Sequence, residues 1–281
     1  MEQPLYLRPT RLEQALAALA ARPWSVLAGG TDFYPARVGR QVREHVLDIT
    51  ALSALRGARR EGGAWRIGAL TTWTDLLRTQ LPPVFDGLKQ AAREVGGLQI
   101  QNAGTLAGNL CNASPAADGV PVLMALDARV ELASMRGTRR LPLAEFISGA
   151  RTTLREPAEL VTAVLVPEHA AGARSAFLKL GARRYLVISI AMVAVTLDVD
   201  AAGSIARAGV AVGACAPTAR RLPALERRLL GHKRTAALAD LVKPADLAPL
   251  TPIDDIRGSA SYRLDAVRTL LRRALEELGR E

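Results

Sequence analysis

The chain has 281 residues, of which 49% are hydrophobic and 23% are charged, and its mean hydropathy is +0.11. This composition excludes an intrinsically disordered chain and supplies enough apolar material for one large or two moderate packed domains. There is no uninterrupted apolar segment long enough to cross a bilayer, and no early basic stretch followed by an apolar run. We therefore expect a cytoplasmic protein without a membrane span.

The formal charge of +10 and a sequence pI near 10.5 raise the question of nucleic-acid binding. However, the arginines are dispersed in short doublets, and aromatic residues make up only 4% of the chain, too few for a platform on which bases stack. A solvated basic surface, or a face that meets an acidic protein or an anionic ligand, is favoured. We expect no nucleic-acid partner.

The spacing of the cysteines and histidines does not predict a metal site. Cys111 and Cys215 are the two cysteines, and neither belongs to a C-x-x-C pair. The histidines, His45, His169 and His232, are too widely spaced to suggest a shared ion. We expect this chain to hold no metal, and we find no pattern typical of a catalytic nucleophile or an acid–base pair.

Short strands and helices alternate in the first half of the chain. A capping box at residues 10–13, followed by apolar residues at helical spacing, predicts a helix from about Arg11 to the residue before Pro23. Strands are predicted at residues 24–28, 45–49, 65–69, 128–133 and 160–166, with a hairpin return at 139–142. Helices are predicted at residues 34–38, 83–95 and 120–126, and a short helix is predicted to follow Thr74 and reach Leu77. The edge of another helix is predicted at residues 141–146.

Two glycine-containing segments are candidate ligand sites. Residues 29–33 follow a predicted buried strand directly, and residues 102–127 read as a loop of small and amide side chains that leads into an apolar run. Backbone N–H groups in such segments can approach pyrophosphate oxygens closely. Ordinary glycine turns explain either segment when it is judged alone. Neither segment matches G-x-G-x-x-G, and the chain contains no P-loop.

After a short polar linker at residues 168–172, the second half has a different pattern. Strands are predicted at residues 176–180, 188–199 and 206–214, and helices at residues 222–230, 235–241 and 262–278. A meander of strands followed by a group of helices is an α+β arrangement.

Four motifs occur in one order along the chain. They are Ala28-Gly29-Gly30-Thr31-Asp32-Phe33, then Thr105-Leu106-Ala107-Gly108-Asn109 followed by residues 113–118, then Lys179 with Arg183-Arg184-Tyr185, and finally residues 255–259 with Tyr262-Arg263. With these motifs the chain resembles the FAD-binding medium subunit of the molybdenum hydroxylases, the family of xanthine dehydrogenase and carbon monoxide dehydrogenase. The resemblance covers essentially the whole chain. One departure is Ala107, where the family usually has glycine, and an alanine there requires φ below zero.

The resemblance implies an α+β fold with a two-subdomain FAD-binding domain of the PCMH or vanillyl-alcohol oxidase type at residues 1–168, divided into about 1–55 and 56–168. A C-terminal domain of antiparallel strands and helices, like that of CO dehydrogenase flavoproteins, would follow at residues 174–281. The two glycine segments would wrap the FAD pyrophosphate, Asp118 would accept hydrogen bonds from the cofactor, and Tyr185 would lie near the isoalloxazine. The implied cofactor-binding residues are Ala28, Gly29, Gly30, Thr31, Asp32, Phe33, Val95, Thr105, Leu106, Ala107, Gly108, Asn109, Ser114, Asp118, Val161, Lys179 and Tyr185.

The resemblance also implies a function. The chain would relay electrons from an iron–sulfur small subunit through FAD to an external acceptor such as NAD, a quinone or oxygen. The molybdopterin would lie on a large subunit and the 2Fe-2S clusters on the small one, in a dimer of heterotrimers. A self-contained flavin-dependent oxidase is an alternative, with Asp118 and Lys179 as its only candidate bases. A basic, non-enzymatic binding module is the other.

Overall fold

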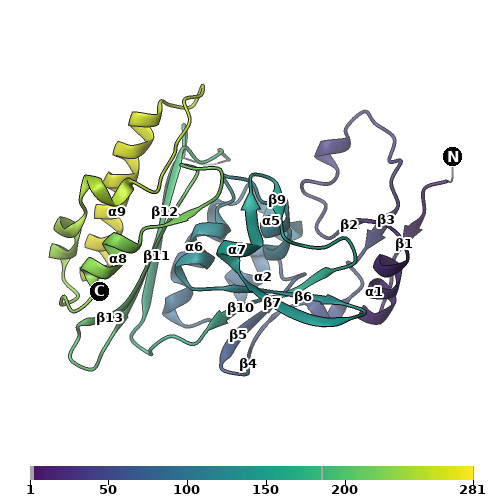
Figure 1. Cartoon of the computed structure of the whole chain (residues 1–281), viewed down its shortest axis with the longest axis horizontal. Coiled ribbons are helices and arrows are strands. Elements are labelled where there is room, and N and C mark those ends of the chain that lie inside the picture. The colour runs from purple at the N-terminus through teal and green to yellow at the C-terminus, as the bar shows by residue number, and fades with distance from the viewer. Residues whose placement is uncertain (1–2, 185, 281) are drawn as a thin grey trace.

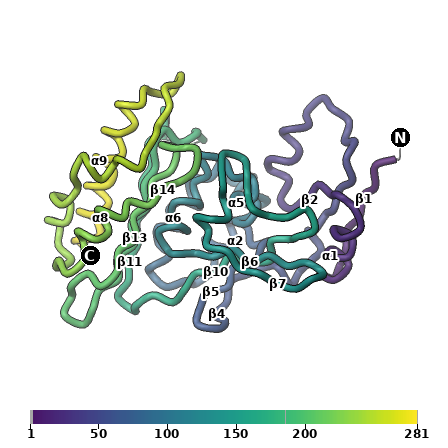
Figure 2. The backbone as a smooth tube through the Cα atoms, in the orientation of Figure 1, coloured from purple at the N-terminus to yellow at the C-terminus, as the bar shows by residue number. Residues whose placement is uncertain are grey.

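The computed structural model describes residues 3–184 and 186–280. The chain runs along the long axis of an elongated molecule, so that its two ends lie far apart (Figures 1 and 2). Three sheets follow one another along this axis, and a two-stranded ribbon of β8 (Ile147–Gly149) and β9 (Thr152–Thr153) completes the strands of the described residues. No helix among these residues is long and apolar enough to cross a membrane.

The N-terminal part is a small parallel sheet with one helix. Its strand order is β1 (Tyr6–Leu7), β3 (Val46–Asp48) and β2 (Ser25–Leu27), and α1 (Leu12–Ala21) connects the two outer strands. Helix α1 buries one apolar face, which forms a local core with residues after β3. The predicted capping box is wrong in detail, because the side chain of Gln14 accepts the backbone N–H groups of Thr10 and Arg11 at 3.3 and 3.2 Å.

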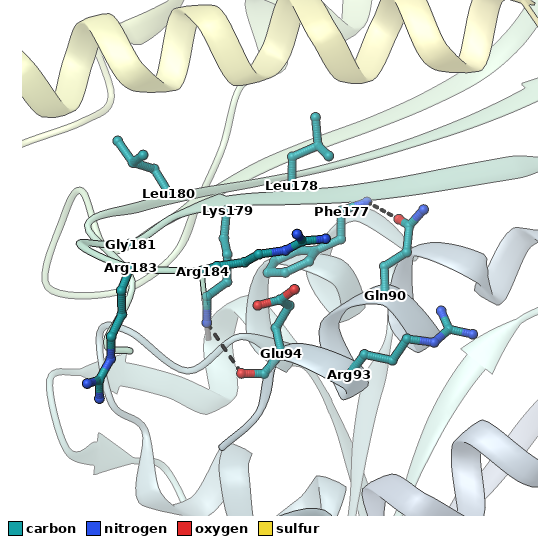
Figure 3. Close-up of a pocket in the computed structure, with 10 residues that line it drawn as sticks. All are labelled: Gln90, Arg93, Glu94, Phe177, Leu178, Lys179, Leu180, Gly181, Arg183 and Arg184. Carbon is teal, nitrogen blue, oxygen red and sulfur yellow. Dashed lines mark hydrogen bonds between the residues drawn. The ribbon is translucent and has the colours of Figure 1, made fainter. Parts of the chain in front are cut away.

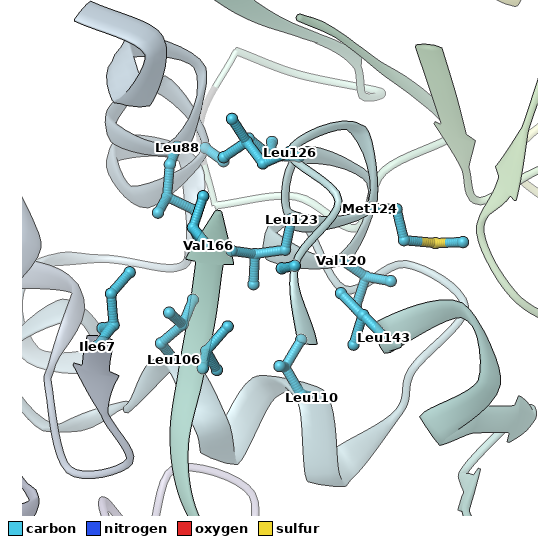
Figure 4. Packing of buried hydrophobic residues seen from close by; sticks show 14 of the residues in the cluster. Ile67, Leu88, Leu106, Leu110, Val120, Leu123, Met124, Leu126, Leu143 and Val166 are labelled. Atoms are coloured by element: carbon cyan, nitrogen blue, oxygen red, sulfur yellow. The ribbon is translucent and has the colours of Figure 1, made fainter. Parts of the chain in front are cut away.

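The central part is a five-stranded antiparallel sheet covered by helices. The strand order is β4 (Ala58–Glu61), β5 (Ala64–Gly68), β10 (Leu160–Pro167), β6 (Arg129–Ser134) and β7 (Gly137–Pro142). The helices are α2 (Trp73–Arg78), α3 (Asp86–Glu94), α4 (Leu98–Ala103), α5 (Leu106–Asn112), α6 (Gly119–Ala125) and α7 (Leu143–Phe146). Their leucines and valines interlock with those of the sheet in the largest core of the molecule (Figure 4).

The C-terminal part is a four-stranded antiparallel sheet that is buried on both faces. The strands are β11 (Arg174–Leu180), β12 (Ala191–Val199), β13 (Ile205–Gly213) and β14 (Arg220–Arg221), in this order. The helices α8 (Pro223–Leu229) and α9 (Ala260–Arg280) cover the outer face, while α3 and α6 pack against the inner one (Figure 1). Alternate residues of β12 therefore belong to different cores, which explains its continuous apolar run.

Short 3₁₀ helices complete the fold, and one of them replaces a predicted helix. They are Pro35–Arg37, Ser53–Leu55, Pro83–Phe85, Ala236–Leu241 and Pro244–Leu247. The helix predicted at residues 235–241 is one of these 3₁₀ turns, and the edge strands β4 and β14 are not among the predicted strands. Strand β4 has a polar sequence and is mostly exposed, so the apolar pattern that predicts a strand is absent there.

The loop predicted before residue 120 is wrong, whereas the helix predicted at residues 120–126 is confirmed by α6. The stretch at residues 102–127 contains the end of α4, all of α5 and all of α6, separated by short turns. Glycine, alanine and asparagine gave it the composition of a loop, but Leu106 and Leu110 are fully buried in the central core. Packing of these apolar residues therefore stabilises a helix whose intrinsic propensity is weak.

Candidate functional site

The first glycine segment begins where β2 ends and passes very close to the C-terminus of α4. A Cβ atom on Gly29 would lie 1.9 Å from the carbonyl oxygen of Ala103, so only glycine fits there. Gly30 has φ of +72°, in the left-handed region that favours glycine. Among the described residues, none accepts a hydrogen bond from the backbone N–H groups of residues 29–33. These donors remain available for a ligand.

The second segment is the beginning of α5. Thr105 is the N-cap, and its Oγ1 accepts the backbone N–H of Gly108 at 3.0 Å. The backbone N–H of Leu106 donates to the Thr71 carbonyl at 3.0 Å, which anchors the segment to the loop before α2. Ala107 lies inside α5, where φ is negative, so the departure from glycine is accommodated without strain.

A cavity of about 510 Å³ lies between the two segments, and we call it the glycine cavity. It brings together ten of the predicted site residues, which are Ala28, Gly29, Gly30, Thr31, Asp32, Phe33, Val95, Thr105, Gly108 and Asn109. The other lining residues were not predicted, and they are Val26, Ala36, Arg37, Trp73, Ile100, Gly104, Cys111 and Asn112. Several of these are direct neighbours of predicted residues, whereas nothing in the sequence links Trp73 to the two segments.

Six of the predicted residues that the structure describes lie elsewhere, and two of them, Asp118 and Lys179, form an ion pair. Leu106 and Ala107 point into the central core, and Val161 is buried in β10 opposite Leu132 of β6. Ser114 lines a separate cavity of about 420 Å³ together with residues of the C-terminal part. Tyr185 lies outside the described residues. Cofactor contacts by these residues stay predictions.

Asp118 and Lys179 form a buried ion pair instead of facing the glycine cavity. Lys179 Nζ lies 2.8 Å from Asp118 Oδ2, and the two side chains are only 6% and 8% exposed. Ser189 donates its hydroxyl to the other oxygen of Asp118 at 2.7 Å. Burial raises the pKa of the Asp118 carboxyl, while the Lys179 ammonium and the Ser189 hydroxyl act in the opposite direction.

The Lys179 ammonium also joins separate parts of the backbone. It reaches the carbonyl oxygen of Glu94 at 3.5 Å, at the end of α3, and that of Val187 at 3.4 Å. Figure 3 shows Lys179 extending from β11 toward Glu94. Because Val95 follows Glu94 and lines the glycine cavity, the buried pair supports one wall of this cavity from behind.

A further cavity of about 520 Å³ lies on the outer side of this wall (Figure 3). It is lined by α3, by β11 and by the turn that follows β11, with Arg93, Arg183 and Arg184 among its residues. Gln90 closes one side, because its Oε1 accepts the backbone N–H of Phe177 at 2.7 Å. The turn and the α3 terminus therefore separate two hollows of different composition.

The family of the chain is decided by sequence. The family described as the FAD binding domain in molybdopterin dehydrogenase matches residues 1–169, and the CO dehydrogenase flavoprotein C-terminal domain matches residues 151–278. The chain belongs to the FAD-binding subunits of the molybdenum hydroxylases. It is therefore an oxidoreductase subunit that binds FAD, and the α+β fold expected from the resemblance is confirmed.

Individual relatives resemble this FAD-binding subunit over nearly their whole length. The nicotinate dehydrogenase FAD-subunit of Eubacterium barkeri is 30% identical over 285 residues, which cover 97% of this chain and 95% of that protein. The carbon monoxide dehydrogenase medium chain of Hydrogenophaga pseudoflava is 30% identical, with coverages of 96% and 95%. A structure of reconstituted CO dehydrogenase from Oligotropha carboxidovorans superposes with a TM-score of 0.91 at 29% identity, covering 99% and 98%.

The glycine cavity of this FAD-binding subunit fits a phosphorylated cofactor. Asn109 Oδ1 is buried and has no hydrogen-bond partner in the described part of the chain, and it belongs to a residue that lines the cavity. The free N–H groups of residues 29–33 supply donors, and Gly29 allows the backbone to come close. Buried polar atoms are normally paired, so an unpaired acceptor beside free donors is typical of a ligand site.

Proposed function

We propose that this chain is the electron-transfer subunit of a molybdenum hydroxylase complex. It would take electrons from an iron–sulfur small subunit and pass them to an external acceptor, NAD, a quinone or oxygen, while a large subunit carries the molybdopterin. Bound FAD supplies the redox chemistry, because flavins accept and donate electrons themselves. The part of the protein is to hold the cofactor between the two glycine segments.

One observation favours the relay over a self-contained flavin oxidase. Such an oxidase needs a positioned base, and the candidates named from the sequence are Asp118 and Lys179. Both side chains are almost fully buried and hydrogen-bonded to each other, so neither is free to take a proton from a substrate. The buried pair supports a structural role for both residues.

The quaternary structure follows from the same proposal. The relatives are named as a medium chain and as FAD subunits, which supports a small iron–sulfur partner and a large molybdopterin partner for this chain. We further propose a dimer of such heterotrimers. A cytoplasmic location, and the domain limits at residues 168 and 174, stay predictions.

Purification of the complex tests the relay. The chain, expressed with its genomic neighbours, should be yellow with one FAD per chain and should co-purify with two polypeptides that carry iron–sulfur and molybdenum. Under anaerobic conditions, the substrate of the complex should bleach the flavin only when the iron–sulfur subunit is present. Bleaching by a substrate in the isolated chain would favour the oxidase, and a colourless chain with salt-dependent DNA affinity would favour the binding module.

A further inference from the structure

Residues 34–44 form an arm that includes η1 (Pro35–Arg37) and ends shortly before β3. Figure 1 shows this arm projecting from the N-terminal end of the molecule, well away from the central sheet. Its apolar side chains are unusually exposed, with Tyr34 at 61%, Val38 at 81% and Val42 at 37%. Large apolar side chains gathered on a projecting segment indicate a surface that another molecule covers.

The arm holds its shape through contacts of its own. The Arg37 guanidinium forms an ion pair with Glu44 across the base of the arm and donates to the Phe33 carbonyl at 2.7 Å. Its central carbon also lies 3.7 Å from the centre of the Phe33 ring. The backbone N–H of Arg40 donates to the Arg37 carbonyl at 2.9 Å. A surface prepared in this way loses little conformational entropy when a partner binds.

Two positive charges of the arm are left without acidic partners. The side chains of Arg40 and Arg43 contact no carboxylate in residues 3–184 and 186–280, whereas Arg37 is paired with Glu44. Arginine and tyrosine are enriched in the cores of protein interfaces, and unpaired rim charges steer partners of opposite charge. The chemistry of the arm therefore fits an acidic protein surface.

The arm also borders the glycine cavity. Phe33, Ala36 and Arg37 line that cavity, and Ala36 and Arg37 also line a second hollow of about 720 Å³ with other residues of the arm. The Tyr34 ring lies directly over Gly30, where an added Cβ atom would be 2.6 Å from the ring. A partner seated on the arm would consequently stand at the edge of the cofactor site.

We propose that the arm is the docking surface for the iron–sulfur subunit that donates electrons, and that Arg40 and Arg43 contact acidic residues of that subunit. This inference rests on the proposed function. Electrons pass efficiently only over short separations, so the donor must bind beside the cofactor cavity. The arm is the basic, apolar-tipped segment that flanks this cavity.

Charge reversal tests the docking surface. The variant Arg40→Glu/Arg43→Glu reverses both unpaired charges, and the matched control Arg268→Glu/Arg273→Glu makes the same change in net charge on exposed positions of α9, at the opposite end of the molecule. Each variant is co-expressed with the other subunits of the complex. Affinity for the iron–sulfur subunit is measured by titration at low and high salt, and FAD per chain is measured from the absorption spectrum.

We expect the arm variant to lose at least about tenfold in affinity for the iron–sulfur subunit, because like charges now face each other. The wild-type affinity should weaken with added salt, and FAD per chain should be unchanged in both variants. Wild-type affinity in the arm variant would overturn the docking surface, as would an equal loss in the control. A loss of FAD from the arm variant would assign the two arginines to the cofactor instead. If no iron–sulfur subunit binds the wild-type chain, the proposed function itself fails.

Discussion

Removal of the Lys179 ammonium should destabilise the fold strongly, and the effect should depend on pH. The variant Lys179→Met keeps the length of the side chain but leaves the Asp118 carboxyl buried with only the Ser189 hydroxyl as donor. Breaking one side of a buried pair costs about 3–5 kcal/mol. The carboxyl can escape this penalty by taking up a proton.

The free energy of protonating Asp118 sets how much stability Lys179→Met loses at each pH. At about pH 7, roughly three units above the ordinary pKa of an aspartate, protonation costs about 4 kcal/mol, and at about pH 5 it costs only about 1.5 kcal/mol. Burial acts in the same direction, because it raises the pKa of the Asp118 carboxyl in the folded chain. A carboxyl whose pKa is higher in the folded state than in the unfolded state lowers the stability as the pH rises above the unfolded-state pKa. The destabilisation by Lys179→Met should therefore shrink as the pH falls.

The partner variant should show the opposite trend. Asp118→Asn leaves the ammonium buried without a counter-ion, and it escapes by losing a proton, which becomes easier as the pH rises. The double variant Asp118→Asn/Lys179→Met removes both charges and should recover most of the lost stability, because no unpaired charge remains in the interior. The two single effects and the double effect together give the coupling energy of the pair.

Urea unfolding of the FAD-loaded chain, followed by tryptophan fluorescence at about pH 5 and about pH 7, measures these free energies. The chain has three tryptophans, and Trp73 lies in the wall of the glycine cavity. Single variants that cost less than about 1 kcal/mol at neutral pH, or effects that simply add in the double variant, would refute the reasoning for a charged and buried pair.

Other variants test other parts of the site and the fold. Gly108→Val should lower FAD per chain while the far-ultraviolet circular dichroism is kept, because a Cβ atom there would lie 2.8 Å from the capping Thr105 Oγ1; full FAD content would place the cofactor elsewhere. Arg263→Met should cost roughly 1–3 kcal/mol in thermal unfolding, since this 2% exposed guanidinium donates to the carbonyl oxygens of Ile190 and Ala214, which would lose that donor. Glu131→Gln should cost roughly 1–3 kcal/mol of stability at neutral pH, and the variant should lose less stability in acid than the wild type. An unchanged pH midpoint of acid unfolding would contradict this prediction.

The direction of the Glu131 effect follows from its surroundings. Burial acts to raise the pKa of this carboxyl, but hydrogen bonds from Thr162 and from Arg66, at 2.8 and 2.6 Å, and from Arg140 outweigh it, and the pKa lies below the ordinary value. A group with a lowered pKa stabilises the fold above its unfolded pKa, and this contribution is lost as the pH falls through the folded pKa. Glutamine at this position carries no such titration.

The two glycine segments illustrate what local sequence determines. Gly29 and Gly30 are needed by backbone geometry alone, since one passes against a carbonyl and the other has positive φ, so their residue type indicates a special turn before any fold is known. The continuous apolar runs of β10 and β12 and the helical periodicity of α9 likewise predict these elements correctly, because such patterns are properties of neighbouring residues. The order of motifs is what identifies the family.

Tertiary packing decided the rest. Residues 106–112 look like a loop from their composition, yet Leu106 and Leu110 fold into the core and make a helix of them. Asp118 and Lys179 are predicted as cofactor contacts, and the packing of β11 against α3 places the ammonium of one against the carboxylate of the other. Contacts between residues 61 positions apart depend on how the sheets stack and leave no periodic trace in the sequence. The two glycine segments are therefore recognisable in the sequence, whereas only the fold shows which predicted residues line the glycine cavity and which lie behind it.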